Sequence, residues 1–102
     1  MPQIEYELKF TEDADLDMAE LLNDNSKRAV AKAVVKSLKF MKVNLKHPSL
    51  NTHKYDDMEG PNGEDIFESY AQNKTPGAYR IFWFYGPGKK EITIVAITPH
   101  PD

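Results

Sequence analysis

The sequence contains no cysteine, which excludes disulfide bonds, thiolate metal sites and a cysteine nucleophile. It also lacks a long hydrophobic stretch, because the longest apolar run, residues 81–85, is far shorter than the roughly 20 residues that a membrane-spanning helix needs. The first ten residues have no basic segment followed by a hydrophobic core, so we expect no signal peptide and a cytoplasmic protein. At 102 residues the chain has the size of one domain, which we predict spans residues 1–102.

The net charge is small, but the charged residues are unevenly distributed. The formal net charge is −3, and a net acidic protein is a poor candidate for binding nucleic acid. Six acidic residues lie in 11–24 and six in 56–68, whereas seven of the 13 basic residues lie in 27–46. The middle block therefore predicts a local basic surface that could still meet a polyanion.

Hydrophobic periodicity predicts the order strand, helix, helix, strand, strand, strand. Residues 4–10 alternate as in a strand with one buried face, and residues 66–72, 78–85 and 91–97 also read as strands. Apolar residues recur at helical spacing in 12–22 and again in 26–46, with Thr11 and Ser26 as the expected N-caps. Residues 48–65 are polar and rich in proline and glycine, so we expect a loop. The prediction is an α+β fold with a two-helix hairpin on one face of a mostly antiparallel four-stranded sheet.

The strand at residues 78–85, AYRIFWFY, is aromatic and β-branched apart from Arg80. A strand that is apolar on both faces is a central strand. A buried guanidinium needs a partner, so Arg80 requires a carboxylate, for which Glu68 on the neighbouring strand is a candidate, or a phosphate, or an opening to solvent. No element remains to cover the second face of the sheet, and we therefore expect a partly open, aromatic-rich binding surface there.

Several pieces of the sequence, in this order and spacing, resemble one known family. They are YELKFTEDADLDMAELL, HPSLNTHKY, GAYRIFWFY and IVAITPHPD, arranged on the β-α-α-β-β-β pattern. Together they are similar to the RelE/ParE family of bacterial toxin–antitoxin toxins. The resemblance extends over nearly the whole chain and depends on the order of the pieces, since no single motif among them is specific.

The resemblance implies one of two activities. RelE-like members cleave mRNA in the ribosomal A site without a metal, whereas ParE-like members inhibit DNA gyrase and have no catalytic site. It therefore implies no cofactor, a cognate antitoxin as partner, and either ribosome-bound mRNA or DNA gyrase as target. The free protein is expected to be a monomer or a weak homodimer. A toxin-like binding protein without activity is a further alternative on the same fold.

The resemblance also suggests candidate catalytic residues. In RelE-like members the arginine of the YRI strand contacts the scissile phosphate, and Arg80 matches it. Some members use a histidine just after the last strand as general acid or base, which corresponds to His100. Cleavage through the 2′-hydroxyl of RNA needs a base, an acid and positive charge at the phosphate. His53 or Lys54 is the candidate for the remaining role.

Three further residues are candidates for contacting the substrate. Tyr70 could position an unpaired base, and Lys32 and Lys36 lie in the basic block. Each candidate also has an ordinary structural interpretation: the lysines can form a solvated face beside the acidic first helix, and the histidines can be surface or chain-end residues. Where ribosome-dependent members have lysines on the second strand, this chain has Glu68 and Ser69, which favours the non-catalytic alternative.

Overall fold

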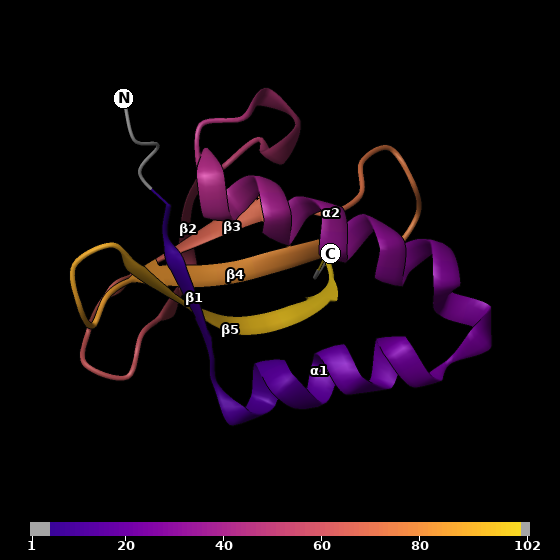
Figure 1. The fold of residues 1–102 in the computed structure, drawn as a ribbon, viewed down its shortest axis with the longest axis horizontal. Helices are drawn as coiled ribbons and strands as arrows, with labels where there is room; N and C mark the ends of the chain where they lie inside the picture. Colours follow the sequence, from indigo (N-terminus) through magenta and orange to yellow (C-terminus); the bar gives the residue numbers. More distant parts are fainter. Residues whose placement is uncertain (1–4, 101–102) are drawn as a thin grey trace.

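The protein is described by a computed structural model that covers residues 5–100 (Figure 1). Its regular elements in chain order are β1 (Glu7–Phe10), α1 (Glu12–Asn23), α2 (Arg28–Val43), β2 (His53–Glu59), β3 (Asp65–Tyr70), β4 (Tyr79–Tyr85) and β5 (Glu91–Pro99). Short 3-10 turns at Asn25–Lys27 and Pro48–Leu50 follow α1 and α2. Ile4, which the predicted first strand includes, lies outside the described residues.

All strands join one sheet in the order β1-β5-β4-β3-β2. Strand β1 pairs in parallel with β5, and the other neighbours are antiparallel. The predicted α+β class and mostly antiparallel sheet are confirmed. The predicted number of four strands is wrong, because part of the expected 48–65 loop forms β2 against β3, with Tyr55 opposite Ile66. This strand is mostly exposed at the sheet edge, so it forms by backbone pairing and shows no hydrophobic alternation.

The helix pair covers one face of the sheet, as predicted. Thr11 caps α1, and its hydroxyl accepts a hydrogen bond from the N–H of Ala14 at 3.2 Å. The second helix begins later than predicted and is not capped by Ser26, because a 3-10 turn at Asn25–Lys27, itself capped by the Asp24 side chain, precedes Arg28. In Figure 1, α2 crosses the sheet in front of β3 and β4, while α1 runs in the opposite direction alongside β5.

The main core lies between the helices and the sheet. It contains Leu21 from α1, Leu38 and Met41 from α2, and Ile81 and Trp83 from β4. Trp83 is fully buried, and its indole N–H donates to the Ser69 hydroxyl at 2.9 Å. A buried polar N–H needs such a partner, so the serine next to Glu68 on β3 has a structural role.

The second face of the sheet is not the open aromatic surface that we expected. Ile66, Phe82 and Phe84 form a second buried cluster there, and Phe82 is only 2 % exposed. The unexpected strand β2 is one reason, because it brings Tyr55 onto Phe82 with ring centroids 5.0 Å apart. Register shifts in the β2–β3 and β4–β5 pairs are a second reason, since such irregularities increase the local twist of a sheet.

Candidate functional site

A cluster of polar side chains surrounds one carboxylate on the face of the sheet opposite the helices. Glu68 of β3 is only 2 % exposed. Its Oε1 lies 2.7 Å from Nε2 of His53, and its Oε2 lies 3.5 Å from Nε of Arg80 and 3.7 Å from Nε2 of His100. Three of the four predicted catalytic residues thus converge on one buried acid, which we call the Glu68 cluster.

Strand register explains this convergence. His53 of β2 is directly opposite Glu68 of β3, and Tyr70 of β3 is directly opposite Arg80 of β4. Residues two apart on a strand share a face, so Glu68 and Tyr70 lie on the same side. His100 follows β5, and its backbone N–H donates to the carbonyl of Ala78 at 2.8 Å, which holds the end of the described chain beside β4.

Arg80 is enclosed within this cluster. It is 7 % exposed, its guanidinium lies 3.6 Å from the ring centroid of Tyr70, and its Nη1 donates to the backbone carbonyl of Gln72. The pairing of Arg80 with Glu68, one of the sequence-based alternatives, is confirmed. A phosphate would reach this guanidinium only after these contacts open, so the phosphate contact stays a prediction.

The two histidines of the cluster are accessible to solvent. The side chains of His53 and His100 are 45 % and 33 % exposed. Nδ1 of His53 lies 2.8 Å from the carbonyl oxygen of Asn51, while Nε2 faces the Glu68 carboxylate. Both ring nitrogens therefore face oxygen acceptors, an arrangement that a protonated imidazolium satisfies with its two N–H donors. His53 is thus oriented to hold a proton beside a carboxylate.

Tyr70 and Tyr55 lie on the same face of the sheet as the Glu68 cluster. Tyr70 lies between Arg80 and His53, and its ring meets the ring of His53 edge-on at 6.0 Å. Partial burial, followed by the negative charges of Asp57 and Glu68, raises the pKa of the Tyr55 hydroxyl.

Among residues 5–100, no group of three or more His, Cys, Asp or Glu side chains could hold a metal ion. The imidazole rings of His53 and His100 can transfer protons, and the charged groups of the cluster can stabilise charge.

The other predicted site residues lie elsewhere. Lys54 follows His53 on β2 and points to the opposite face, where its Nζ lies 3.7 Å from Asp56 and 3.5 Å from Asp65. Lys32 and Lys36 lie on α2, which packs on the other face of the sheet. The Glu68 cluster and these lysines thus lie on different faces of the sheet. A short RNA segment could contact both only by passing around the edge of the sheet.

The sequence indicates Glu68 as a possible partner of Arg80 and as a departure from the lysines of ribosome-dependent toxins, but not as the centre of a cluster. The signal that could have found its wider role is a glutamate at an inward-facing position of a strand next to apolar neighbours. A charge at such a position is rarely buried without several partners. The partners come from residues 53, 80 and 100, and only the folded sheet brings them together.

The fold is similar to those of solved toxin structures. A YoeB/ParE toxin from Agrobacterium tumefaciens superposes with a TM-score of 0.67 at 7 % identity, over 93 % of this chain and 99 % of that one. An archaeal RelE-RelB complex from Pyrococcus horikoshii gives 0.62 at 14 % identity, over 93 % and 94 % of the two chains. A YoeB-YefM complex from Staphylococcus aureus gives 0.64 at 14 % identity, over 94 % and 98 %.

Sequence comparison alone gives no such result. No protein-family model matches this chain, and no curated protein matches it. In the part of the chain that the structure describes, neither helix is both long and apolar enough to cross a bilayer. The likeness thus lies in the three-dimensional arrangement: two helices on one face of a mixed sheet, at identities of 7 % and 14 %. The chain has the fold of the RelE/ParE-type toxins.

Proposed function

We propose that this protein is the toxin of a toxin–antitoxin pair and that it cleaves ribosome-bound mRNA at the Glu68 cluster. The fold supports the toxin assignment. The observation that supports cleavage is that two solvent-accessible histidines, from β2 and from the end of β5, share one buried carboxylate. Histidine can give or take a proton near neutral pH, and a buried carboxylate can orient an imidazole for this purpose.

The proposed reaction uses the 2′-hydroxyl of the RNA as nucleophile. His100 takes the proton from the 2′-hydroxyl while its oxygen attacks phosphorus. The bond from phosphorus to the 5′-oxygen breaks, and His53 gives its proton to that oxygen. The products are a 2′,3′-cyclic phosphate and a 5′-hydroxyl end. His53 is assigned the acid role because both of its ring nitrogens face oxygen acceptors, and in this step its Nε2–H turns from Glu68 to the 5′-oxygen.

Arg80 and Glu68 are positioning residues in this proposal. Arg80 holds Glu68 in place from within the sheet, and Glu68 in turn orients the two histidine rings. The imidazolium of His53 supplies positive charge beside the pentavalent phosphorus. Tyr70, whose ring lies between Arg80 and His53, provides a surface on which a neighbouring base can stack.

The test uses the three histidines of the chain. His53→Gln and His100→Gln are each expected to lower cleavage of ribosome-bound mRNA by about 10²- to 10⁴-fold, the usual contribution of a general acid or base. His47→Gln is the matched control, because His47 stacks on Phe40, 3.9 Å between centroids, outside the cluster. Growth arrest on expression and 5′-hydroxyl ends on the cut mRNA are the measurements. Full cleavage by both cluster variants would refute the proposal.

A second candidate is a non-catalytic toxin that inhibits DNA gyrase. It is favoured by the enclosure of Arg80, and by the negative charge of Glu68 beside the position that a phosphate would occupy. The variant with both His53→Gln and His100→Gln separates the two candidates. If this variant still arrests growth, induces a DNA-damage response and inhibits supercoiling by purified gyrase, the gyrase activity is correct and the nuclease proposal is wrong.

A further inference from the structure

The histidine of β2 follows a tight turn that fixes the chain just before this strand. Residues Pro48–Leu50 form a single 3-10 turn after α2, and Leu50 is fully buried in the main core. Asn51 ends this turn in the left-handed region, with φ 46° and ψ 43°, and its backbone N–H donates to the carbonyl of Pro48 at 3.2 Å. The backbone of Asn51 is therefore anchored two residues before His53.

The left-handed conformation determines where the carbonyl of Asn51 points. Asparagine and aspartate adopt this conformation more readily than other residues with a side chain, glycine adopts it freely, and β-branched residues hardly adopt it at all. The carbonyl oxygen lies 2.8 Å from Nδ1 of His53. The Asn51 side chain is exposed and, among residues 5–100, takes part in no hydrogen bond. The main chain of Asn51, and not its amide group, thus contacts the histidine.

This contact decides which nitrogen of His53 carries a proton. A carbonyl oxygen can only accept a hydrogen bond, so the proton lies on Nδ1. On the other side of the ring, Nε2 lies 2.7 Å from Oε1 of Glu68, and a bare lone pair on Nε2 would repel the carboxylate. A second proton therefore lies between these two atoms. Without the Asn51 carbonyl, a neutral ring with its single proton on Nε2 would satisfy Glu68 equally well, and a neutral imidazole is a much weaker acid.

The residue between Asn51 and His53 is held from the helical side of the sheet. Oγ1 of Thr52 lies 2.8 Å from Oγ of Ser69, which is fully buried and accepts the indole N–H of Trp83 at 2.9 Å. A buried hydroxyl needs an acceptor for its own proton, and Oγ1 of Thr52 is the acceptor beside Ser69. A chain of hydrogen bonds from the core thus fixes Thr52, while its two neighbours contact each other through the carbonyl and the imidazole ring.

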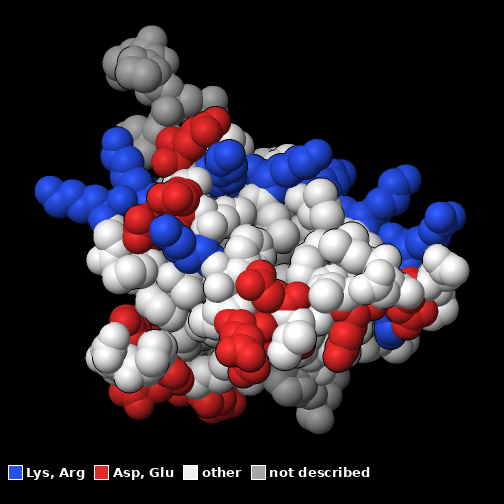
Figure 2. Space-filling model, turned by 60° about the horizontal axis from the view of Figure 1, so that its bottom comes forward, with Lys and Arg blue, Asp and Glu red and all other residues white. Residues whose placement is uncertain are grey.

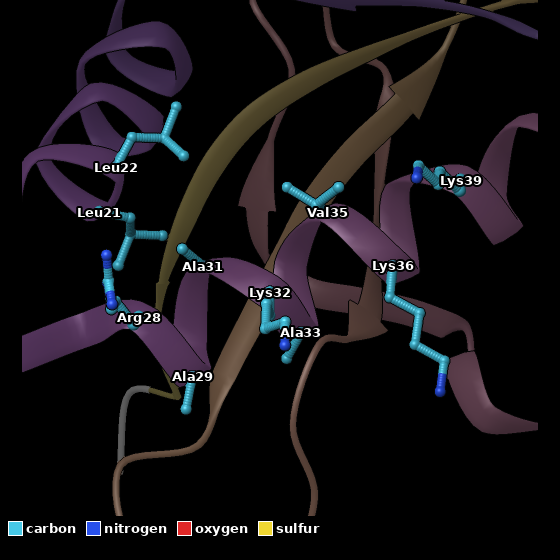
Figure 3. A pocket seen from close by; sticks show the side chains of 10 residues that line it. All are labelled: Leu21, Leu22, Arg28, Ala29, Ala31, Lys32, Ala33, Val35, Lys36 and Lys39. Carbon is cyan, nitrogen blue, oxygen red and sulfur yellow. The ribbon is translucent and has the colours of Figure 1, made fainter. Parts of the chain in front are cut away.

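The charged surfaces of the two helices do not reach His53. Figure 2 shows acidic side chains over α1 and basic side chains gathered along the neighbouring edge. Figure 3 shows Lys32, Lys36 and Lys39 on α2 around a hollow of about 1020 Å³, which Leu21 lines from α1. These helices cover the face of the sheet opposite the Glu68 cluster. The orientation of His53 therefore depends on the short-range contacts of its own segment.

We propose that Asn51 is a positioning residue for the reaction at the Glu68 cluster. Its main-chain carbonyl, aimed by the left-handed backbone, keeps a proton on Nδ1 of His53, so that Nε2 faces Glu68 as part of an imidazolium. The inference rests on the proposed function for one detail, that this imidazolium is the general acid. When Nε2–H turns to the 5′-oxygen and gives up its proton, the Asn51 carbonyl still holds the ring in place through Nδ1–H.

The experiment records the ring nitrogen and proton resonances of His53 in the full-length, ¹⁵N-labelled protein at mildly alkaline pH. The spectrum of His53→Gln assigns them. Asn51→Gly keeps the left-handed backbone, whereas Asn51→Val opposes it. Lys90→Val is the matched control, because Lys90 is also left-handed, with φ 58°, but lies in the turn between β4 and β5. Urea unfolding compares the stability of the two valine variants, and the kcat and KM for cleavage of ribosome-bound mRNA are measured for each protein.

The wild type and Asn51→Gly should show a proton on Nδ1 of His53, and Asn51→Val should show the neutral ring with its proton on Nε2. In Asn51→Val, kcat should fall about tenfold with KM unchanged, a smaller loss than the roughly 10²-fold or more for removal of the acid itself. Lys90→Val should lose similar stability but keep the His53 resonances and the cleavage rate.

The resonances of the wild type decide the inference even where Asn51→Val fails to fold. A wild-type His53 without a proton on Nδ1 would overturn it, as would an unchanged Nδ1 proton in folded Asn51→Val or an equal loss of kcat in Lys90→Val. These ring measurements use no RNA. Failure of the nuclease proposal appears separately, as full cleavage by His53→Gln and His100→Gln.

Discussion

Replacing Glu68 by leucine tests whether the buried acid organises the cluster. Glu68 is 2 % exposed and Arg80 is 7 % exposed, so water cannot replace either partner. Without Glu68, the guanidinium of Arg80 keeps only backbone carbonyls and the Tyr70 ring. Removing one partner of a buried ion pair typically costs 3–5 kcal/mol. Because these neutral contacts remain, we expect a loss near the lower end, about 3 kcal/mol.

The reverse substitution, Arg80→Leu, should be less costly. Glu68 then still has His53 at 2.7 Å and His100 at 3.7 Å, and we expect a loss of about 2 kcal/mol. The double variant leaves no unpaired charge between these two positions. Apolar replacement of a whole buried pair is often neutral. The double variant should therefore lose about 2 kcal/mol of folding stability, instead of about 5 kcal/mol, the sum of the two single losses.

Urea unfolding at neutral pH measures these differences. With a slope of about 1.5 kcal/mol per molar urea, the midpoint of Glu68→Leu should fall by about 2 M. A domain of this size has a total stability of about 5–15 kcal/mol, so the variants should still fold. Two results would refute the reasoning: a midpoint shift below about 0.5 M for Glu68→Leu, or a double variant whose loss equals the sum of the single losses.

Three further predictions concern stability. Ser69→Ala should cost about 1–3 kcal/mol, because it leaves the buried indole N–H of Trp83 without its acceptor; a thermal or urea midpoint equal to that of the wild type would contradict this. Thr11→Ala should cost about 1 kcal/mol by removing the cap of α1, with Thr11→Ser near the wild type; equal losses for both would argue against the cap. Hydrogen bonds from the hydroxyl and backbone N–H of Ser26 lower the pKa of Asp24, so its stabilisation is present at neutral pH and lost as the pH falls through the folded-state pKa. The deficit of Asp24→Ala in urea midpoint should therefore shrink below the ordinary Asp value of 3.8, and a deficit independent of pH would rule this out.

The sequence by itself determined the order of the elements other than β2, and most of their positions. Alternation in 4–10 and the apolar spacing in 12–22 and 26–46 are local patterns, and they predict β1, α1 and α2, although β1 begins only at Glu7 and α2 spans only Arg28–Val43. Thr11 as an N-cap is likewise local, because the capping bond joins residues three apart. The requirement of Arg80 for a partner also followed from charge and burial alone, and Glu68 was a candidate because it lies on the neighbouring strand, where it is opposite Phe82.

The tertiary structure decided the rest. Strand β2 has a polar, exposed sequence, so only its backbone pairing with β3 identifies it. That added strand places His53 on Glu68 and Tyr55 on Phe82, which both completes the cluster and fills the face that the sequence left open. The separation of Lys32 from the cluster depends on which face α2 covers. Such contacts join residues far apart in the chain, and no local pattern encodes them, because they depend on strand register and on the packing of whole elements.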